Sequence, residues 1–234
     1  MQNVVFNWSG GKDSSLALYH LQKNKDLSVK YLFTSVNEVY QRISMHGVRV
    51  SLLKEQANGL NIPLKQLLLP ENPSMETYEN LMQEEMKNFK QEGLTHFVFG
   101  DIFLEDLKNY RIAQLKKVEM SASFPLWKRD TRELIYEFID LGFKAITVCV
   151  DNRYLDQSFV GRVIDGAFVE SLPPEVDPCG ENGEFHTFVF DGPIFSEPIH
   201  FEIGEIVKRS YPNPSTDEIE ITFDFCDLMP DKQS

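Results

Sequence analysis

The stretch Ser9-Gly10-Gly11-Lys12-Asp13-Ser14 decides the fold of this chain. It follows a short apolar run at residues 3–8, which predicts a β-strand, and it leads into helix-forming residues at 14–23. A glycine pair between a strand and a helix is typical of a phosphate-binding loop, because glycine lets the backbone turn tightly and approach a ligand. The amides at the start of the helix attract anions. Lys12 adds a positive charge, and we expect it to face solvent when no ligand is bound.

Strand-like and helix-like segments alternate through the first two thirds of the chain. Further strands are predicted at 29–36, 64–69, 95–99 and 144–150, and helices at 46–60, 73–92, 106–120 and 134–141. Such alternation predicts an α/β fold with a doubly wound, mostly parallel sheet and helices on both of its faces. In sheets of this kind, ligands bind outside the carboxyl ends of the strands.

Two of these helices have sequence signals at their starts. Asn72 is predicted as an N-cap and Pro73 as the first helical residue of a helix that ends at Gly93. Asp130 and Glu133 resemble a capping box. The first of these helices has an apolar stripe at steps of three and four, formed by Met75, Tyr78, Met82, Met86 and Phe89.

The pattern changes after residue 151. Residues 153–172 are predicted to be helical in part, and strands are predicted at 186–190, 199–207 and 218–225. The last two alternate apolar and polar residues, which is typical of half-buried antiparallel strands, and Tyr211-Pro212-Asn213-Pro214 joins them. We therefore predict two domains, 1–151 and a smaller α+β region at 152–234, with a cleft between them.

Composition excludes several classes of protein. The 36 acidic and 23 basic residues give a formal net charge of −13, which argues against a nucleic-acid partner. No apolar run is long enough for a transmembrane helix, and the start does not resemble a signal peptide, so we expect no membrane partner. The 3 cysteines are widely spaced, which favours a cytoplasmic protein. The sequence leaves open whether the chain forms a homodimer.

The side chains of the loop suit a nucleotide. Ser9 and Ser14 offer hydroxyl donors, and Asp13 is a candidate ligand for Mg²⁺ bridging phosphate oxygens. The spacing is not that of a Walker A loop. The loop resembles the pyrophosphate loop of the N-type ATP pyrophosphatases, whose pattern is Ser-Gly-Gly-x-Asp-Ser. The resemblance implies an adenine nucleotide alpha hydrolase-like fold, with ATP and Mg²⁺ bound at residues 9–14.

A second polar segment lies near the carboxyl terminus. Cys179-Gly180-Glu181-Asn182-Gly183-Glu184-Phe185-His186-Thr187 places acidic, imidazole and hydroxyl groups in and after a tight loop. Acidic turn residues are often merely solvated, so this segment alone leaves function and solvation equally open. Together with the first motif it resembles the diphthine–ammonia ligase family, as do Pro125-Leu126-Trp127 and Gly100. Gly100 is thereby implied in nucleotide binding.

The chain departs from that family where substrate contacts are expected. Asp101 stands where diphthamide-forming members usually have alanine, Lys108-Asn109-Tyr110-Arg111 replaces Asp-Tyr-Gln-Arg, and His186 replaces a glutamate. The chain resembles a bacterial branch of the family whose hosts lack diphthamide, so its substrate stays open.

The resemblance implies an ATP-dependent ligase. A small-molecule or protein-borne carboxylate would be adenylated with release of pyrophosphate and passed to ammonia or an amine. We expect Lys12, Asp13, Glu184 and His186 to be catalytic, and the substrate to contact Glu181, Asn182, Gly183, Glu184, His186 and Thr187. The alternatives are an RNA-modifying (thiolating) ATP pyrophosphatase and a non-enzymatic nucleotide-binding protein.

Three further residues are undecided. His46 and Arg49 follow the second predicted strand. They either contact a phosphate or carboxylate, or have no role beyond lying at the start of a helix. Cys179 has no basic neighbour in the sequence to lower its pKa, which argues against a thiol nucleophile.

Overall fold

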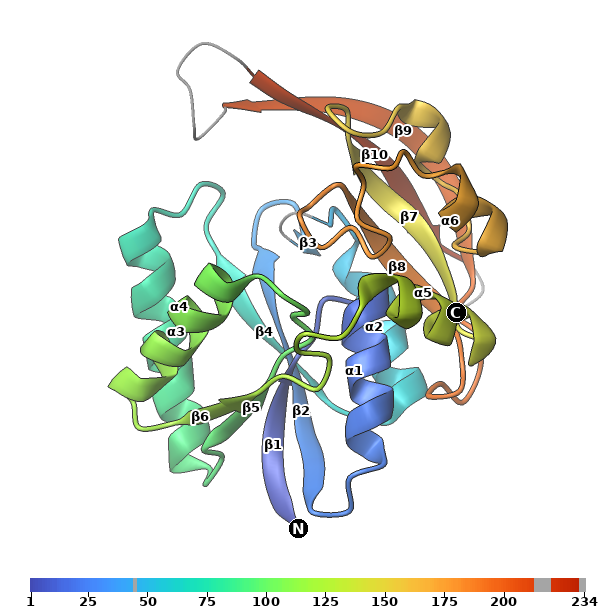
Figure 1. Ribbon diagram of the computed structural model, residues 1–234. Coiled ribbons are helices and arrows are strands. Elements are labelled where there is room, and N and C mark those ends of the chain that lie inside the picture. Colours follow the sequence, from blue (N-terminus) through green and yellow to red (C-terminus); the bar gives the residue numbers. More distant parts are fainter. Residues whose placement is uncertain (44–45, 213–219, 232–234) are drawn as a thin grey trace.

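A mostly parallel sheet, sheet A, forms the first part of the molecule. The computed structural model describes residues 1–43, 46–212 and 220–231 (Figure 1). The strands of sheet A are β1 (Gln2–Asn7), β2 (Leu27–Asn37), β3 (Arg42–Ile43), β4 (Leu64–Leu69), β5 (His96–Val98) and β6 (Ser121–Ser123). β1 lies between β2 and β5, β4 and β6 lie outside them, and all these pairs are parallel, whereas β3 is antiparallel to β2. The predicted α/β class is confirmed.

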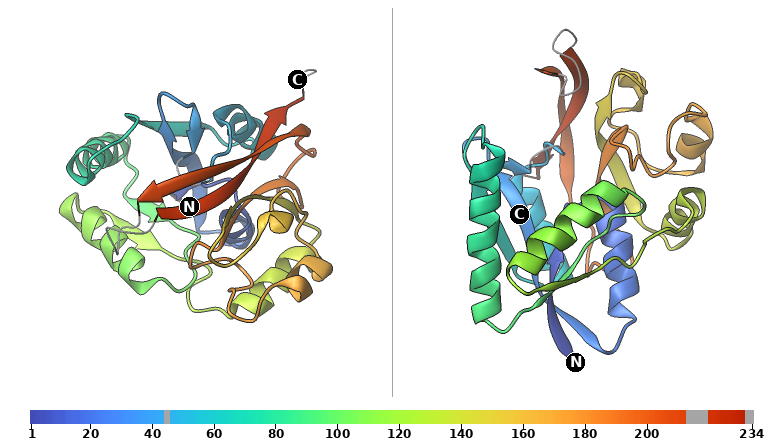
Figure 2. Two further views of the ribbon diagram at one scale, coloured as in Figure 1. Left: turned by 90° about the horizontal axis from the view of Figure 1, so that it is seen from above. Right: turned by 60° about the vertical axis from the view of Figure 1, so that its left-hand side comes forward.

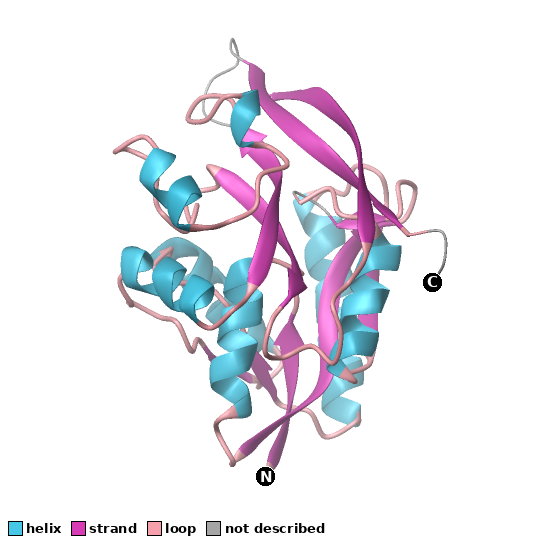
Figure 3. Ribbon diagram, turned by 90° about the vertical axis from the view of Figure 1, so that its right-hand side faces the viewer, coloured by secondary structure: helices cyan, strands magenta, loops and turns pink. Residues whose placement is uncertain are grey.

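Helices cover both faces of sheet A (Figure 3). α1 (Lys12–Gln22) and α2 (Val50–Leu60) lie on one side, and α3 (Met75–Gln91) and α4 (Glu105–Lys117) on the other (Figure 1). Strand β1 supplies both cores in alternation, because Val4 and Phe6 join one apolar cluster and Val5 joins the other. Burial on both faces explains why the centre of β1, Val4-Val5-Phe6, has three apolar residues in succession.

Sheet B is smaller and antiparallel. Its strands β7 (Lys144–Asp151), β8 (Phe185–Asp191), β9 (Phe201–Pro212) and β10 (Glu220–Pro230) have the order β8-β7-β10-β9. β9 and β10 form a long two-stranded ribbon (Figure 2). The short elements α5 (Thr131–Asp140), η1 (Gln157–Phe159) and α6 (Gly166–Ser171) complete this part. Residues 213–214 of the predicted connection lie outside the described residues.

The expected place of the seventh strand is wrong. The sequence predicts residues 144–150 as part of the parallel sheet, but β7 pairs antiparallel with β8 and β10. A strand buried on both faces is an apolar run in either kind of sheet, so its sequence does not reveal its partners. The two sheets thus divide the chain before β7, while the domain boundary at residue 151 stays a prediction.

The helix starts are partly as expected. Asp130 caps α5 by accepting a hydrogen bond from the Glu133 amide. For α3, Ser74 replaces the predicted Asn72 as the N-cap, since its side chain accepts from the Thr77 amide. Met75 is 67% exposed and does not belong to the buried stripe. No helix in the described ranges has the length and apolar character needed to cross a bilayer.

Sheet B lies over the carboxyl-terminal edge of sheet A, opposite the amino terminus (Figures 1 and 3). The Val189 amide of β8 donates to the Gly10 carbonyl (2.9 Å), which ties sheet B to the glycine loop. Asp227 of β10 pairs with Arg42 (2.9 Å) and Arg49 (2.6 Å). The second part of the chain is therefore held where a ligand of sheet A would bind.

Candidate active site

The glycine loop has a backbone that only glycine fits well. Gly10 has a φ of +77°, and a Cβ there would lie 2.7 Å from Leu53 Cδ2 and 2.8 Å from Gln56 Oε1. Gly11 is the N-cap residue of α1 and has no side chain that could cap the helix. Hydroxyl groups of Ser9 and Thr187 accept from the Gly11 and Lys12 amides instead, at a helix start of the kind that binds anions.

Gln56 fixes this loop, and sequence reasoning missed it. Its Nε2 donates to the carbonyls of Gly10 (3.0 Å) and Val189 (2.7 Å), and its Oε1 accepts from Trp8 Nε1 (2.8 Å). The side chain is fully buried. One glutamine therefore joins α2, the loop and β8, and only the tertiary fold brings these segments together.

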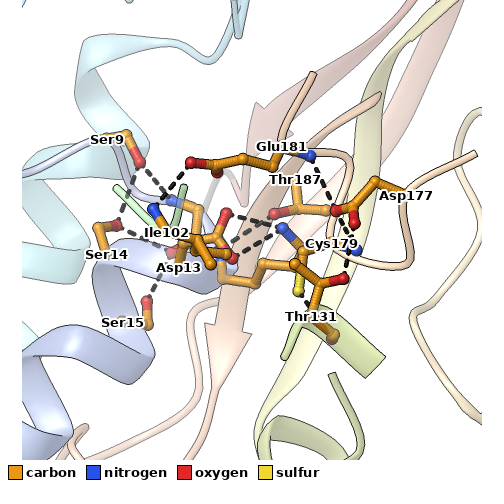
Figure 4. A network of polar contacts seen from close by, with 12 residues as sticks. Ser9, Asp13, Ser14, Ser15, Ile102, Thr131, Asp177, Cys179, Glu181 and Thr187 are labelled. Carbon is orange, nitrogen blue, oxygen red and sulfur yellow. Dashed lines mark hydrogen bonds and ion pairs between the residues drawn. The ribbon is translucent and has the colours of Figure 1, made fainter. Parts of the chain in front are cut away.

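The serines of the motif hold the loop rather than point to solvent. Ser9 Oγ donates to Ser14 Oγ (3.1 Å) and accepts from the Gly11 amide (3.3 Å). Ser14 and Ser15 both donate to the Gly11 carbonyl, at 2.9 and 3.0 Å (Figure 4). The arrangement gives the loop one defined conformation before any ligand binds.

Lys12 does not face solvent as expected. Its side chain is 4% exposed, and its Nζ lies 2.9 and 2.7 Å from the two carboxylate oxygens of Asp13. Burial lowers the pKa of Lys12, but nearby acidic groups, Asp13 first among them, together outweigh it and raise the pKa to about 12. Burial raises the pKa of Asp13, and Lys12 opposes this shift. The expectation failed because the adjacent acidic residue captures the ammonium group.

The loop before β8 that carries Glu181 and Glu184, here called the acidic loop, reaches this ion pair. Glu181 accepts hydrogen bonds from the amides of Ile102 (2.8 Å) and Phe103 (3.3 Å), which follow β5 (Figure 4). Burial, and next the charge of Asp13, raise the pKa of Glu181 to about 7. Glu181 also contributes to the raised pKa of Lys12. The two motifs seen in the sequence are thus neighbours in space.

The two glutamates of the acidic loop differ. Glu184 is 1% exposed, and its Oε1 accepts from the Asp177 amide and from Asn182 Nδ2, both at 3.0 Å. Its Oε2 has no hydrogen-bond partner among the described residues. Glu184 therefore braces the turn around Gly183, which has a φ of +90° and open space at its Cβ position.

Asp177 and Cys179 complete the loop. Asp177 accepts from the amides of Cys179 (2.9 Å) and Glu181 (3.2 Å) and from the Thr131 hydroxyl (2.6 Å). The thiol of Cys179 donates to the Thr131 carbonyl (3.3 Å). Burial raises the pKa of that thiol far above its usual value although Lys12 is near, so it is not a ready nucleophile.

The start of β8 lies against the glycine loop. Thr187 Oγ1 accepts from the Lys12 amide (3.0 Å). His186 stacks on His46, with ring centroids 4.5 Å apart and an interplanar angle of 29°. Burial lowers the pKa of His186 well below its usual value, so this ring is neutral near pH 7.

Gly100 belongs to the same site. A Cβ there would lie 3.1 Å from the backbone of Asp13, so glycine lets the segment after β5 approach the start of α1 closely. Next to it, Asp101 forms an ion pair with Arg111, at 3.0 Å between Oδ2 and Nε. The guanidinium of Arg111 lies 4.5 Å from the centre of the Phe99 ring. The departure from the family pattern at Asp101 therefore has its own partner on α4.

A cavity of about 570 Å³ lies between the two parts of the chain, away from the glycine loop. It is lined by Glu55, Asn58, Gly59, Glu197, Pro198, Ile199, His200 and Asp231. Within the described ranges, no group of three or more His, Cys, Asp or Glu side chains could hold a metal ion. A metal at Asp13 would therefore need ligands from the nucleotide.

Two family models together match most of the chain. The model described as the diphthamide synthase N-terminal domain matches residues 1–119, and the one described as the diphthamide synthase C-terminal domain matches 130–213. The chain is similar to a diphthine–ammonia ligase of Schizosaccharomyces pombe, with 23% identity over 86% of this chain and 36% of the relative. It is also similar to diphthine–ammonia ligases of Homo sapiens (24%, covering 86% of this chain and 84% of the relative) and Bos taurus (27%, 55% and 51%).

The chain spans only about a third of the yeast relative and about half of the bovine one. The matched domains nevertheless contain both motifs of the site, the glycine loop in the first and the acidic loop in the second. The chain belongs to the diphthamide synthase family.

Proposed function

We propose that this protein is an ATP-dependent ligase that adenylates a carboxylate, releases pyrophosphate and transfers the acyl group to ammonia or an amine. The observation that supports it best is the Ser9–Ser14 loop, preorganised at the start of α1 and contacted by Thr187 of β8. The curated relatives are named as diphthine–ammonia ligases, a name in which ammonia is one of the two reactants. We also propose a cytoplasmic location.

The glycine loop would hold the phosphates of ATP. Amides at the start of α1 would donate to phosphate oxygens, and those of Gly11 and Lys12 would exchange their present acceptors, Ser9 Oγ and Thr187 Oγ1, for phosphate. Lys12 would stabilise the charge that develops at the α-phosphorus. Since Lys12 is paired with Asp13, a phosphate must compete for the ammonium group. Asp13 is a carboxylate with 29% of its side chain exposed, so it suits Mg²⁺, which would neutralise phosphate charge.

The acidic loop would serve the second half of the reaction. We propose that Glu181, which lies near Lys12 and Asp13, faces the acceptor or amine. Its carboxylate could take a proton from the amine as the amine attacks the acyl adenylate and AMP leaves. Glu184 would act by holding the loop, because it is buried and its Oε1 is already bonded. Asn182, Gly183, His186 and Thr187 would shape the surrounding pocket.

The substrate itself stays open between a small molecule and a protein-borne carboxylate. The Asp101–Arg111 ion pair makes this rim of the site more polar than an alanine would. That difference favours a substrate other than the one on which the curated relatives act.

The test is calorimetry with ATP and Mg²⁺, followed by pyrophosphate release against a panel of carboxylic acids with ammonium. We expect ATP to bind with micromolar to millimolar affinity and one class of acid to stimulate pyrophosphate release. No ATP binding at saturating Mg²⁺ would refute the proposal. Binding without any turnover across the panel would favour a non-enzymatic nucleotide-binding protein.

A further inference from the structure

We propose that His46 is a phosphate-binding residue of the nucleotide site, donating a ring N–H to the phosphate chain beside the Gly11 amide. This inference rests on the proposed function, because it places a further contact on the same ATP molecule. The sequence left His46 and Arg49 equally open between ligand binding and a structural role, and the structure separates them.

His46 lies against the start of α1. It stands between β3 and α2, and its Cε1 is 3.4 Å from where a Cβ of Gly11 would stand. The Thr187 carbonyl and hydroxyl oxygens lie 3.1 and 3.3 Å from the same point. Because Gly11 is the N-cap of α1, the imidazole is beside a helix start, where a phosphate that displaces the Ser9 and Thr187 hydroxyls from the amides would be held.

One ring nitrogen of His46 has an unmet hydrogen bond. Nδ1 of His46 is buried and has no hydrogen-bond partner among the residues that the structure describes. Leaving a buried polar atom unpaired costs about 1–3 kcal/mol, and native proteins rarely do so without a reason. A ligand at the glycine loop would supply the missing partner.

The ring of His46 is neutral at pH 7. Burial and the charge of Lys12 lower its pKa to about 4, while the nearby Thr187 backbone opposes this shift. The neutral imidazole carries one N–H. A phosphate at Nδ1 would therefore compete with the Thr187 backbone for that N–H. His186 stacks on its face and fixes the plane of the ring, so the N–H has a defined direction.

Arg49 is not available for the same task. Its Nε and one terminal nitrogen bind the two carboxylate oxygens of Asp227 at 3.0 and 2.6 Å. Arg42 binds the same carboxylate from β3 at 2.9 Å. Arg49 therefore joins the start of α2 to β10, whereas His46 lies against the loop.

The experiment follows the ring nitrogens of His46 by ¹⁵N NMR during titration of the whole chain with ATP and Mg²⁺, with pyrophosphate, and with adenosine. We expect the Nδ1 resonance of His46 to shift with ATP and with pyrophosphate, and to stay unchanged with adenosine. The resonances of His20, which pairs with Glu137 far from the loop, should not move in any arm. A shift with adenosine alone would place the base or ribose there and overturn the proposal.

A substitution gives an independent readout. His46→Phe keeps a flat ring against His186 but removes the N–H, so ATP affinity measured by calorimetry should fall about tenfold, the value of one hydrogen bond. His20→Phe is the matched control and should bind ATP as the wild type does. An affinity within twofold of wild type, in a His46→Phe protein with an unchanged melting temperature, would overturn the proposal.

The proposed function and the role of His46 are refuted by different results. If the wild type binds no ATP, the proposed function falls and this inference falls with it. If the wild type binds ATP while the His46 resonance does not move, only the role of His46 is refuted. Should His46→Phe fail to fold, the NMR titration of the wild type still decides.

Discussion

Gly10→Ala should destabilise the protein strongly, because the alanine Cβ has no room at this point of the loop. Gly10 has a φ of +77°, and the added Cβ would lie 2.7 Å from Leu53 Cδ2 and 2.8 Å from Gln56 Oε1. The left-handed backbone costs a residue with a Cβ about 1–2 kcal/mol. Forcing an extra methyl group into a packed core costs about 1–3 kcal/mol more.

The sum is a loss of about 2–5 kcal/mol in the free energy of unfolding. For a chain of this size that corresponds to a melting temperature lower by about 5–20 °C. Gln56 cannot retreat without cost, since it bonds Gly10, Val189 and Trp8. ATP affinity should fall as well, because the loop amides move with the loop.

Gly93→Ala is the matched control. Gly93 has a φ of +80°, yet nothing lies within 4 Å of its Cβ position. This variant should lose only the free energy of unfolding that the backbone conformation costs, about 1–2 kcal/mol. Urea denaturation of both variants measures the difference, which is the cost of the close contacts at Gly10. If the two variants lose the same stability within about 0.5 kcal/mol, a common experimental margin for such comparisons, the contacts do not constrain the loop and the reasoning fails.

Four other outcomes are expected. Lys12→Met should abolish pyrophosphate release and lower the free energy of unfolding by about 1–3 kcal/mol, since Asp13 loses its partner; turnover in this variant would contradict the role of Lys12. Burial would raise the pKa of Asp227, but two arginines outweigh it and hold the pKa at about 2, below the unfolded value. The contribution of Asp227 to the free energy of unfolding is therefore present above pH 4 and declines by about 1–2 kcal/mol as the pH falls from 4 to 2. In pH-dependent urea denaturation, Asp227→Asn should lack this decline. Glu181→Gln should change ATP affinity by less than about threefold in calorimetry yet slow acyl transfer about 10²-fold, whereas Glu184→Gln should slow it less; the reverse order would exchange their roles. With a formal net charge of −13, the protein should not retard tRNA or DNA in gels at physiological salt, and a salt-sensitive complex would revive an RNA-modifying function.

Local sequence sufficed for the elements that decide the fold. The strand, glycine loop and helix at residues 2–22 follow from neighbouring residues, because turn, cap and periodicity are all local properties. The same holds for the cap at Asp130. β3 and β6 were missed because strands of two and three residues have no periodicity to detect.

Partners distant in sequence could not be predicted. The sequence showed two polar motifs, but not that the Ile102 and Phe103 amides would hold Glu181 beside the ion pair. Nor did it show Gln56 bonding to β8. Contacts of this kind depend on how sheet B packs on sheet A, which no local pattern encodes. The partner of the buried Lys12 is its neighbour Asp13, but adjacency in sequence does not show that the two side chains turn toward each other.

The charge balance of the site shows what a ligand must bring. One ammonium group, that of Lys12, lies among three carboxylates, because Asp13, Asp177 and Glu181 each act on one another or on the lysine. A bare triphosphate would meet more negative than positive charge and would be repelled. A nucleotide that arrives with Mg²⁺ carries the compensating charge, and an amine arriving afterwards would find carboxylates in place of phosphate once pyrophosphate has left. The acidic groups that oppose a metal-free nucleotide would therefore favour the second reactant. The electrostatics of this site thus support an order of binding in which the nucleotide comes first and the amine second.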